Sequence, residues 1–400
     1  MSSIYKSGTS LLSGNRLQLA NWSSYSREDQ SKIIKGVCEA FKAASPYELE
    51  AQDIKSYYRM TVGDEALEAF MNPRREFDAL EYSAVDSSNF SRITKSLVEN
   101  RMTMAFQSEA FVFSQLIPNN PAENLHGDKI PGITPMGDEA EVVEEGANYP
   151  RTSFGDEYIE TPASKKRGTI VSITREAIWN NRTRNILGNA AKIGEFLGLN
   201  KEKRLVDIVL GAVNTYKRNG TAVNTYQTST PWINDSSNEL VDYTDVENAM
   251  ILQRRLTDPN TGEPIIITSA QMVVCPAKEM TARRILGGTG MDIASASDLI
   301  TRTLSPNPLG GSPIRLAVSQ LLEVRGVSEL SLSQSNASKY WFLGDFAKAF
   351  SYEEVFPLTV TQSPPNAEAA FYRDIVAEYK ASERGAAAVM EPRYVVRSKN

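Results

Sequence analysis

His126 is the chain's only histidine, and it lies in the polar segment Asn124-Leu-His-Gly127. A single histidine excludes HExxH zinc sites and any metal centre that needs two histidines. A Ser-His-Asp triad would have to use His126, but the sequence contains no GxSxG nucleophile elbow. We therefore predict that His126 is a solvated loop residue and that the chain carries no catalytic site of a known type.

Three further groups have residue types that bind cofactors or metals. The Gly-rich run Leu286-Gly-Gly-Thr-Gly290 follows an expected helix, whereas a phosphate-binding loop follows a strand and ends in Lys-Ser/Thr. Asp292 and Asp298 lack the spacing of a calcium loop. Cys38 and Cys275 lie far apart without a CxxC motif, which is typical of buried small hydrophobic residues. We expect a flexible loop at the Gly-rich run, and no metal or cofactor.

A cluster of carboxylates spans Asp138, Glu139, Glu141, Glu144 and Glu145. Such a cluster fits either a paired-carboxylate or metal site, or a solvated or interface charge patch. No converging partner residues accompany it in the sequence, so we interpret it as an exposed or interface patch.

This cluster opens a long arm, which returns through basic residues into a strand expected at 169–173. A loop of this length without its own core is uncommon and is usually functional. An arm that is negative on its way out and positive at its return suits contact with a neighbouring copy. We expect a self-assembling protein whose inter-subunit contacts include Glu141, Glu144, Glu145, Lys165, Lys166 and Arg167.

A long helix is expected directly after this strand, from Thr174 as N-cap to about Thr215, with a possible break near Gly198. Ile186, Ala190, Ile193 and Leu197 recur at helical spacing. Three glycines lie within the helix, and each costs about 1 kcal/mol relative to alanine. Either another backbone approaches closely there, or the helix must bend; the hinge candidates are Gly188, Gly194 and Gly198.

The composition is that of a globular protein of 400 residues with a net charge of −6. No stretch approaches the ~20 apolar residues needed to cross a bilayer, and the N-terminus lacks an apolar signal core, so we expect a cytosolic chain. The acidic balance argues against tight binding of bare nucleic acid. It is compatible with a container wall that must not adhere to DNA.

The remaining elements are read from periodicity and turn signals. The first hundred residues show helices with narrow apolar stripes and long polar connectors, which fits an arm docked on other copies. Beyond residue 220 the pattern is mixed α/β. We expect helices at 242–256 and 277–286, strands at 265–267, 272–274, 314–318, 340–343 and 394–396, and a helix or strand at 374–379.

Several segments in a fixed order resemble one known family. They are Glu144-Glu-Gly146 with Tyr149-Pro150, then Thr169-Ile-Val-Ser-Ile-Thr-Arg-Glu176, and further on 256–264, 341–345, 374–385 and 392–396. Over about residues 105–397 their order resembles the major capsid protein of tailed bacteriophages, the Hong Kong 97 phage fold.

This resemblance implies an α+β fold with an N-terminal helical arm at 1–105 and a peripheral domain that begins at 106–219. That domain would include an extended loop at 139–168 and a spine helix at 174–215. An axial domain would follow at 220–360, and 361–400 would return to the peripheral domain. One branch of the family forms Lys–Asn cross-links. Here the run Phe371-Tyr-Arg-Asp-Ile-Val376 has no asparagine, and the one nearest to it, Asn366, lies in a Pro-rich turn, so we expect none.

The implied function is structural: hexamers and pentamers form an icosahedral shell around a double-stranded DNA genome. The chain would not be an enzyme. Its partners would be copies of itself, portal, decoration or scaffold proteins, and loosely held DNA, without a membrane. It would be located in the virion after assembly in the host cytoplasm. The alternatives are an encapsulin-like nanocompartment shell, another phage structural protein, or an enzyme with an unrecognised site.

Overall fold

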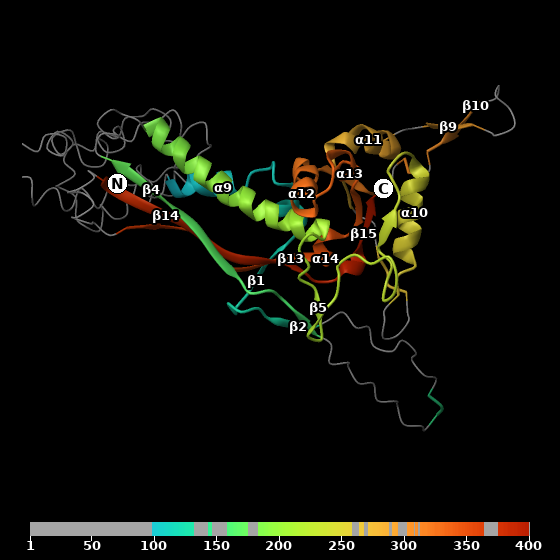
Figure 1. The fold of residues 1–400 in the computed structure, drawn as a ribbon, viewed down its shortest axis with the longest axis horizontal. Helices are drawn as coiled ribbons and strands as arrows, with labels where there is room; N and C mark the ends of the chain where they lie inside the picture. The colour runs from blue at the N-terminus through green and yellow to red at the C-terminus, as the bar shows by residue number, and fades with distance from the viewer. Residues whose placement is uncertain are drawn as a thin grey trace, which may run out of the picture. The chain divides into compact units, whose positions relative to one another are not determined.

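Figure 1 shows the computed structural model of the chain. It describes residues 98–131, 143–145, 158–174, 183–257, 264–267, 271–287, 290–294, 302–307, 309–310, 313–363 and 375–399. The expected N-terminal arm, 1–105, therefore lies almost wholly outside the described residues.

The chain divides into two compact units, and each is built from separate segments. Unit 1 comprises Met1–Ser108, Lys166–Leu199 and Phe356–Arg384. Unit 2 comprises Glu109–Lys165, Asn200–Val355 and Gly385–Asn400. The expected division into arm, peripheral domain and axial domain stays a prediction.

A five-stranded sheet forms the centre of unit 2, in the order β11-β8-β12-β15-β7. The inner strands β8 (Gln271–Val274), β12 (Trp341–Gly344) and β15 (Val395–Lys399) are antiparallel. The outer strands β11 (Arg315–Val318) and β7 (Asp235–Ser237) each run parallel to their neighbour. The strands predicted at 272–274, 314–318, 340–343 and 394–396 are thus confirmed, with boundaries that shift by one to three residues.

Both faces of this sheet are covered, because successive side chains of a strand point to opposite faces. Met272 and Val274 pack in one core, with residues of α10 (Tyr243–Arg254) and α11 (Glu279–Gly287). Val273 and Cys275 pack in the other core, with the second half of α9 (Thr183–Leu210) and with α12 (Gln320–Leu330). A strand buried on both faces reads as a continuous apolar run, as the central strands β8 and β12 do at Met272–Val274 and Trp341–Leu343.

A smaller sheet in unit 2 has the order β2-β3-β5-β6 and antiparallel pairing throughout. Its strands are β2 (Lys129–Pro131), β3 (Tyr158–Glu160), β5 (Lys217–Arg218) and β6 (Thr221–Ala222). Pro131 pairs with Tyr158, so residues 132–157 leave and return at this sheet. The expected extended loop was placed at 139–168, but its return limb is already paired at Tyr158.

The long helix α9 runs from Thr183 to Leu210 without the expected break near Gly198. It ends before Thr215 because Gly211 adopts a left-handed conformation with φ of 75°. Gly211 N–H donates to Ile208 O and Ala212 N–H to Asp207 O, the two bonds of a Schellman motif. At the other end Thr174 is the last residue of strand β4 (Lys165–Thr174), and 175–182 lie outside the described residues.

A sheet of longer strands has the order β1-β13-β14-β4. β1 (Asn119–Pro121) runs parallel to β13 (Phe350–Gln362), and β14 (Ile375–Val389) follows. The expected helix or strand at 374–379 is therefore the start of strand β14. Strand β13 has no counterpart among the elements expected from the sequence.

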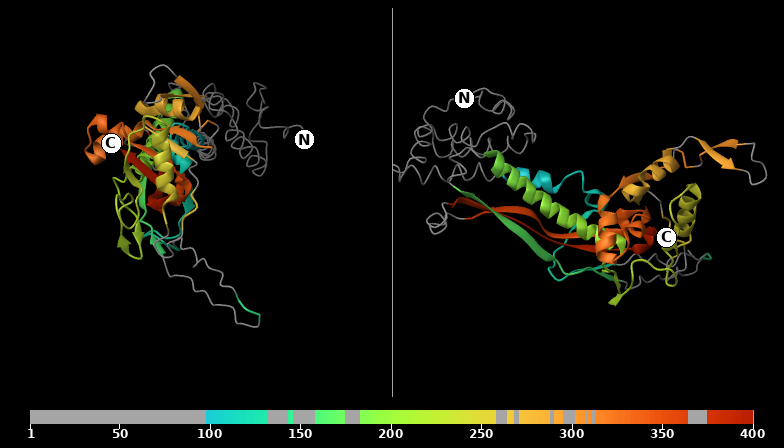
Figure 2. Two further views of the ribbon diagram at one scale, coloured as in Figure 1. Left: turned by 90° about the vertical axis from the view of Figure 1, so that its right-hand side faces the viewer. Right: turned by 45° about the horizontal axis from the view of Figure 1, so that its top comes forward.

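Short elements complete the described part of the chain. The strand expected at 265–267 is wrong, because these residues form no strand beyond the bridge Thr257–Pro264. The loop expected at the Gly-rich run lies between the end of α11 at Gly287 and the start of a strand at Gly290, and its residues 288–289 lie outside the described residues. The remaining short elements are the helices α7 (Val112–Leu116), α13 (Gln334–Ala337) and α14 (Phe346–Ala349), and the 3₁₀ turns Pro276–Lys278 and Pro392–Tyr394. β9 (Gly290–Ala294) and β10 (Arg302–Pro306) form a hairpin, seen in Figure 2 beyond α11. No described helix has the length and apolarity to span a bilayer.

Candidate assembly site

The side chains that the sequence singled out for possible chemistry are placed only in part by the described residues. His126 is exposed in a turn, and no described group of three or more His, Cys, Asp or Glu residues could hold a metal ion. Cys275 is buried, and burial raises the pKa of its thiol to about 12. A thiol that stays protonated is a poor nucleophile. Cys38 lies outside the described residues.

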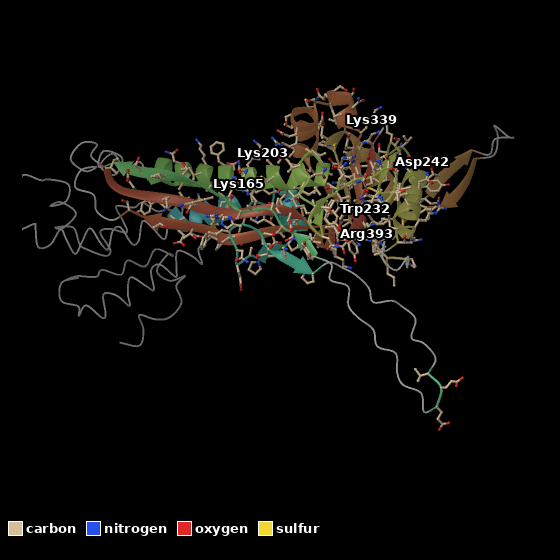
Figure 3. All side chains as sticks on the ribbon, turned by 60° about the horizontal axis from the view of Figure 1, so that its bottom comes forward. Lys165, Lys203, Trp232, Asp242, Lys339 and Arg393 are labelled. Carbon is tan, nitrogen blue, oxygen red and sulfur yellow. The ribbon has the colours of Figure 1, made fainter. Side chains whose placement is uncertain are left out.

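The acidic and basic residues expected at subunit contacts are solvent-accessible where they are described. Glu144 and Glu145 are exposed, whereas Glu141 lies outside the described residues. Lys165 (labelled in Figure 3) and Lys166 are exposed, and Arg167 is half-buried. An inter-subunit role requires such access.

The basic residues do not flank residues 132–157, which connect strand β2 to strand β3 and are called the excursion 132–157 below. Lys165, Lys166 and Arg167 open strand β4 instead, after the paired base at Tyr158–Glu160 has ended. The start of this strand is fixed, because Ser164 donates to Leu125 O from its backbone N–H at 3.0 Å and from its hydroxyl at 3.1 Å. The basic cluster is therefore presented on a defined strand end.

The three glycines of α9 have different surroundings. A Cβ atom on Gly194 would lie 2.2 Å from the carbonyl oxygen of Met102, far closer than atoms can approach. A Cβ atom on Gly188 would meet none of the described residues within 4 Å. Gly198 is buried. Close backbone approach, one of the two explanations left open by the sequence, therefore applies at Gly194 but not at Gly188.

Asp235, Arg397 and Lys399 form an ion cluster at the β7 edge of the five-stranded sheet, and nothing in the sequence predicted it. Arg397 donates to both carboxylate oxygens of Asp235, at 3.1 and 2.7 Å, and to Leu210 O at 2.7 Å. Lys399 Nζ lies 2.9 Å from the same carboxylate. Burial raises the pKa of Asp235, but the hydrogen bonds and positive charges of Arg397 and Lys399 together outweigh this effect and hold the pKa below its ordinary value. The cluster joins β7 and β15.

Two carboxylates on α9 fasten this helix to other elements of unit 2. Glu202 accepts from the Phe113 and Ser114 N–H groups, at 2.7 and 2.8 Å, and so satisfies the N-terminus of α7. Burial raises the pKa of Glu202, an effect that these hydrogen bonds partly offset. Asp207 accepts two bonds from Arg325 on α12, at 2.7 and 2.6 Å. These hydrogen bonds hold the C-terminal half of α9 against α7 and α12.

An aromatic and a charged side chain meet just before strands β7 and β15 begin. Arg393 lies over the Trp232 ring, 5.9 Å from its centroid (both labelled in Figure 3), and donates to both carboxylate oxygens of Glu391 at 2.6 Å. Arg393 and Glu391 are both almost fully buried. Neither this pair nor the ion cluster on β15 has a local signal in the sequence.

A sequence profile of the phage capsid protein family matches residues 158–398. The chain therefore belongs to the phage capsid protein family. This match confirms the resemblance indicated by the order of segments along the sequence. No curated protein matches the chain.

Solved structures with related folds include capsids and a virus-like particle. The virus-like particle from Pyrococcus furiosus is 10% identical with a TM-score of 0.39, covering 74% of this chain and 98% of that one. The capsid of the native GTA particle is 13% identical with a TM-score of 0.42, covering 73% and 90%. The capsid of cyanophage P-SCSP1u is 12% identical with a TM-score of 0.44, covering 72% and 87%. These likenesses are distant, so the family assignment rests on the sequence match.

Proposed function

We propose that this chain is the major head protein of a tailed bacteriophage and assembles as hexamers and pentamers into an icosahedral shell around double-stranded DNA. The observation that carries the proposal is the match of the phage capsid protein family over residues 158–398. The protein is a structural component of the virion, assembled in the host cytoplasm, and has no catalytic role. Portal, scaffold or decoration proteins are its further partners.

Surface features of each unit support an assembling protein. In unit 1, Phe196 and Ile170 are 67% and 61% exposed; in unit 2, Ile266 and Met280 are 92% and 75% exposed. Single exposed apolar residues are common on any protein, but these are large and unusually accessible. Shell formation would bury some of them between copies, and many weak repeated contacts sum to a stable shell.

The acidic excursion and the basic strand start support the same proposal. Glu144, Glu145, Lys165 and Lys166 are exposed, so a neighbouring copy can reach all four. We propose that the negative residues meet positive surfaces on adjacent copies and that Lys165–Arg167 meet negative ones. Each exposed pair contributes about 0–1 kcal/mol, which repetition over a shell multiplies.

Size-exclusion chromatography followed by negative-stain electron microscopy of the purified protein tests the proposal. A major head protein gives closed polyhedral particles in the void volume. Rings, tubes or trimers would indicate a tail or decoration protein, and a monomer or small oligomer would leave the enzyme alternative. Closed shells that enclose a protein cargo in the native source, and no DNA, would indicate a nanocompartment instead.

A further inference from the structure

The turn between β5 and β6 consists of Asn219 and Gly220. Both have left-handed backbone conformations, with φ of 48° and 78°. The flanking residues Arg218 and Thr221 pair directly, so this is a two-residue hairpin turn with positive φ at both positions, typical of type I′. Glycine adopts this conformation freely, and asparagine tolerates it better than most residues. The turn is encoded locally.

This turn contacts the residue at which the excursion 132–157 rejoins the described chain. Tyr158 N–H donates to Asn219 Oδ1 at 3.0 Å, and Asn219 N–H donates to Tyr158 O at 3.0 Å. Tyr158 is the first residue of β3 and pairs with Pro131, the last residue of β2. The Asn219 side chain thereby extends the β3–β5 pairing one residue beyond Ile159–Arg218.

Hydrogen bonds also join the other end of the β2–β3 pair, where Asp128 and Thr161 lie. Thr161 N–H donates to Asp128 O at 3.0 Å, and Asp128 N–H donates to Thr161 Oγ1 at 2.8 Å. Gly127 approaches so closely that a Cβ atom there would lie 2.2 Å from Thr161 O. Between the two ends, Ile159 is buried in the main core. The register of the pair is therefore fixed from both sides.

We propose that the Asn219–Gly220 turn is a positioning device for contacts between copies: it fixes the β2–β3 pair, and residues 132–157 connect these two strands. A two-stranded ribbon is marginally stable in water, and β2 and β3 have three residues each. The β5–β6 hairpin supplies the third and fourth strands at the exit point. This inference rests on the proposed function, because the consequence of a misdirected loop is a failed contact with a neighbouring copy.

Three variants separate the hydrogen bond from the turn. Asn219→Gly keeps the positive φ but removes the side-chain acceptor for Tyr158 N–H. Asn219→Asp keeps both an acceptor oxygen and a residue that tolerates this conformation. Asn224→Ala is the matched control, because Asn224 is also exposed and accepts a bond at 2.7 Å from Asn214.

The readouts are amide hydrogen exchange at Tyr158, the melting temperature of the subunit, and the rate of particle formation. For Asn219→Gly we expect exchange at Tyr158 to be about fivefold faster, the effect of losing one ordinary hydrogen bond, with slower assembly and a nearly unchanged melting temperature. Asn219→Asp and Asn224→Ala should behave as wild type.

Normal assembly of Asn219→Gly despite faster exchange would overturn the positioning role. A fall in melting temperature that accounts for the whole assembly defect would also overturn it, since the turn would then serve the fold. A wild-type chain that forms no particles would contradict the proposed function instead. Even in that case, an amide exchange rate at Tyr158 that is the same in Asn219→Gly as in wild type would contradict the proposed role of the Asn219 side chain.

Discussion

Gly194 on α9 lies against the backbone of Met102, so that a Cβ atom on Gly194 would be 2.2 Å from the Met102 carbonyl oxygen. The nearest atom is backbone, which cannot rotate away as a side-chain end can. Glycine is therefore required at this position for packing. A role of α9 as a hinge during shell expansion stays a prediction, and Gly188, which has open space around it, is the glycine that packing does not explain.

Alanine substitutions at the two glycines should have opposite effects. Gly194→Ala forces the helix away from Met102 and should lower the free energy of unfolding by about 1–3 kcal/mol. Gly188→Ala adds helix propensity in open space and should raise it by up to about 1 kcal/mol. Urea unfolding of the unassembled subunit measures both, each variant serving as the other's control. Stabilisation by Gly194→Ala would contradict the close packing.

A separate comparison tests the hinge. If α9 bends at Gly188 when the shell expands, Gly188→Ala should slow expansion of preformed shells while initial assembly stays normal, because alanine disfavours local opening of the helix. Time-resolved small-angle X-ray scattering measures the particle radius. Expansion at the wild-type rate would show that Gly188 is not a hinge.

Asp235→Asn should destabilise unit 2 strongly, because it leaves the half-buried Arg397 without its counter-ion. Loss of one partner of a buried pair costs about 3–5 kcal/mol. Lys399→Met is the control: Lys399 is 32% exposed, and its loss should cost under about 1 kcal/mol. Chemical denaturation of the subunit measures both. Equal effects would mean that Arg397 is not the main partner of Asp235.

The Asp235–Arg397 pair also predicts that the folded subunit loses stability in acid. The pKa of Asp235 is lowered in the folded state, so its contribution is present above the unfolded pKa of about 3.9 and is lost as pH falls through the folded value. The melting-temperature difference between wild type and Asp235→Asn should therefore shrink below about pH 4. A difference that stays constant down to pH 2 would contradict the linkage.

Glu353 should have the opposite pH dependence. Its side chain is buried and accepts from Ser351 Oγ at 2.6 Å; burial raises its pKa above the ordinary value, and this hydrogen bond only partly offsets the rise. The native state therefore holds this proton to higher pH than the unfolded state, whose pKa is about 4.3. Wild-type stability should fall as pH rises through the folded value.

Glu353→Gln removes that titration. Its melting temperature relative to wild type should increase from pH 4 towards pH 7, as differential scanning fluorimetry would show. Glu354→Gln, at the adjacent half-buried position, is the control and should give a much smaller change with pH. A pH-independent difference for Glu353→Gln would show that Glu353 is not the titrating group.

Charge reversal of Lys165, Lys166 and Arg167 to Glu should impair assembly more than it lowers the melting temperature of the subunit. The exposed pairs are individually weak and screened by salt, so added salt should slow wild-type assembly as well. Light scattering follows both effects. Reversal of the exposed Arg254, Arg255 and Arg284 is the matched control. An equal loss of subunit stability would assign the basic cluster to the fold.

The sequence predicted those elements whose signals are local. Helix α10 begins at a capping box in which Asp242 accepts from Thr244 N–H and Asp245 accepts from Asp242 N–H. Strands β8 and β12 contain the apolar runs Met272–Val274 and Trp341–Leu343, as expected for strands buried on both faces, whereas in β15 only the first two residues are apolar. The Asn219-Gly220 dipeptide is also a strong hairpin signal, although only a domain boundary near residue 220 is expected from the sequence.

Elements that depend on distant partners were missed. Strand β13 contains Pro357 and the pair Glu353-Glu354, which disfavour a strand assignment until β14 and β1 are placed beside it. Helix α12 contains Gly326, whose added Cβ would lie 3.1 Å from the Cβ of Ala337. Asp235 and Arg397 are brought together only by the sheet. Pairings of this kind have no period and no motif along the chain.

The most direct measurement of the central claim is single-particle cryo-electron microscopy of the purified wild-type protein. If the chain is a major head protein, the particles are closed shells in which every capsomer is built from copies of this chain, with pentamers at the vertices and hexamers between them. Residues 132–157 of each copy would lie on a neighbouring subunit. Open tubes, isolated rings or a dispersed monomer under conditions that keep the subunit folded would contradict the account.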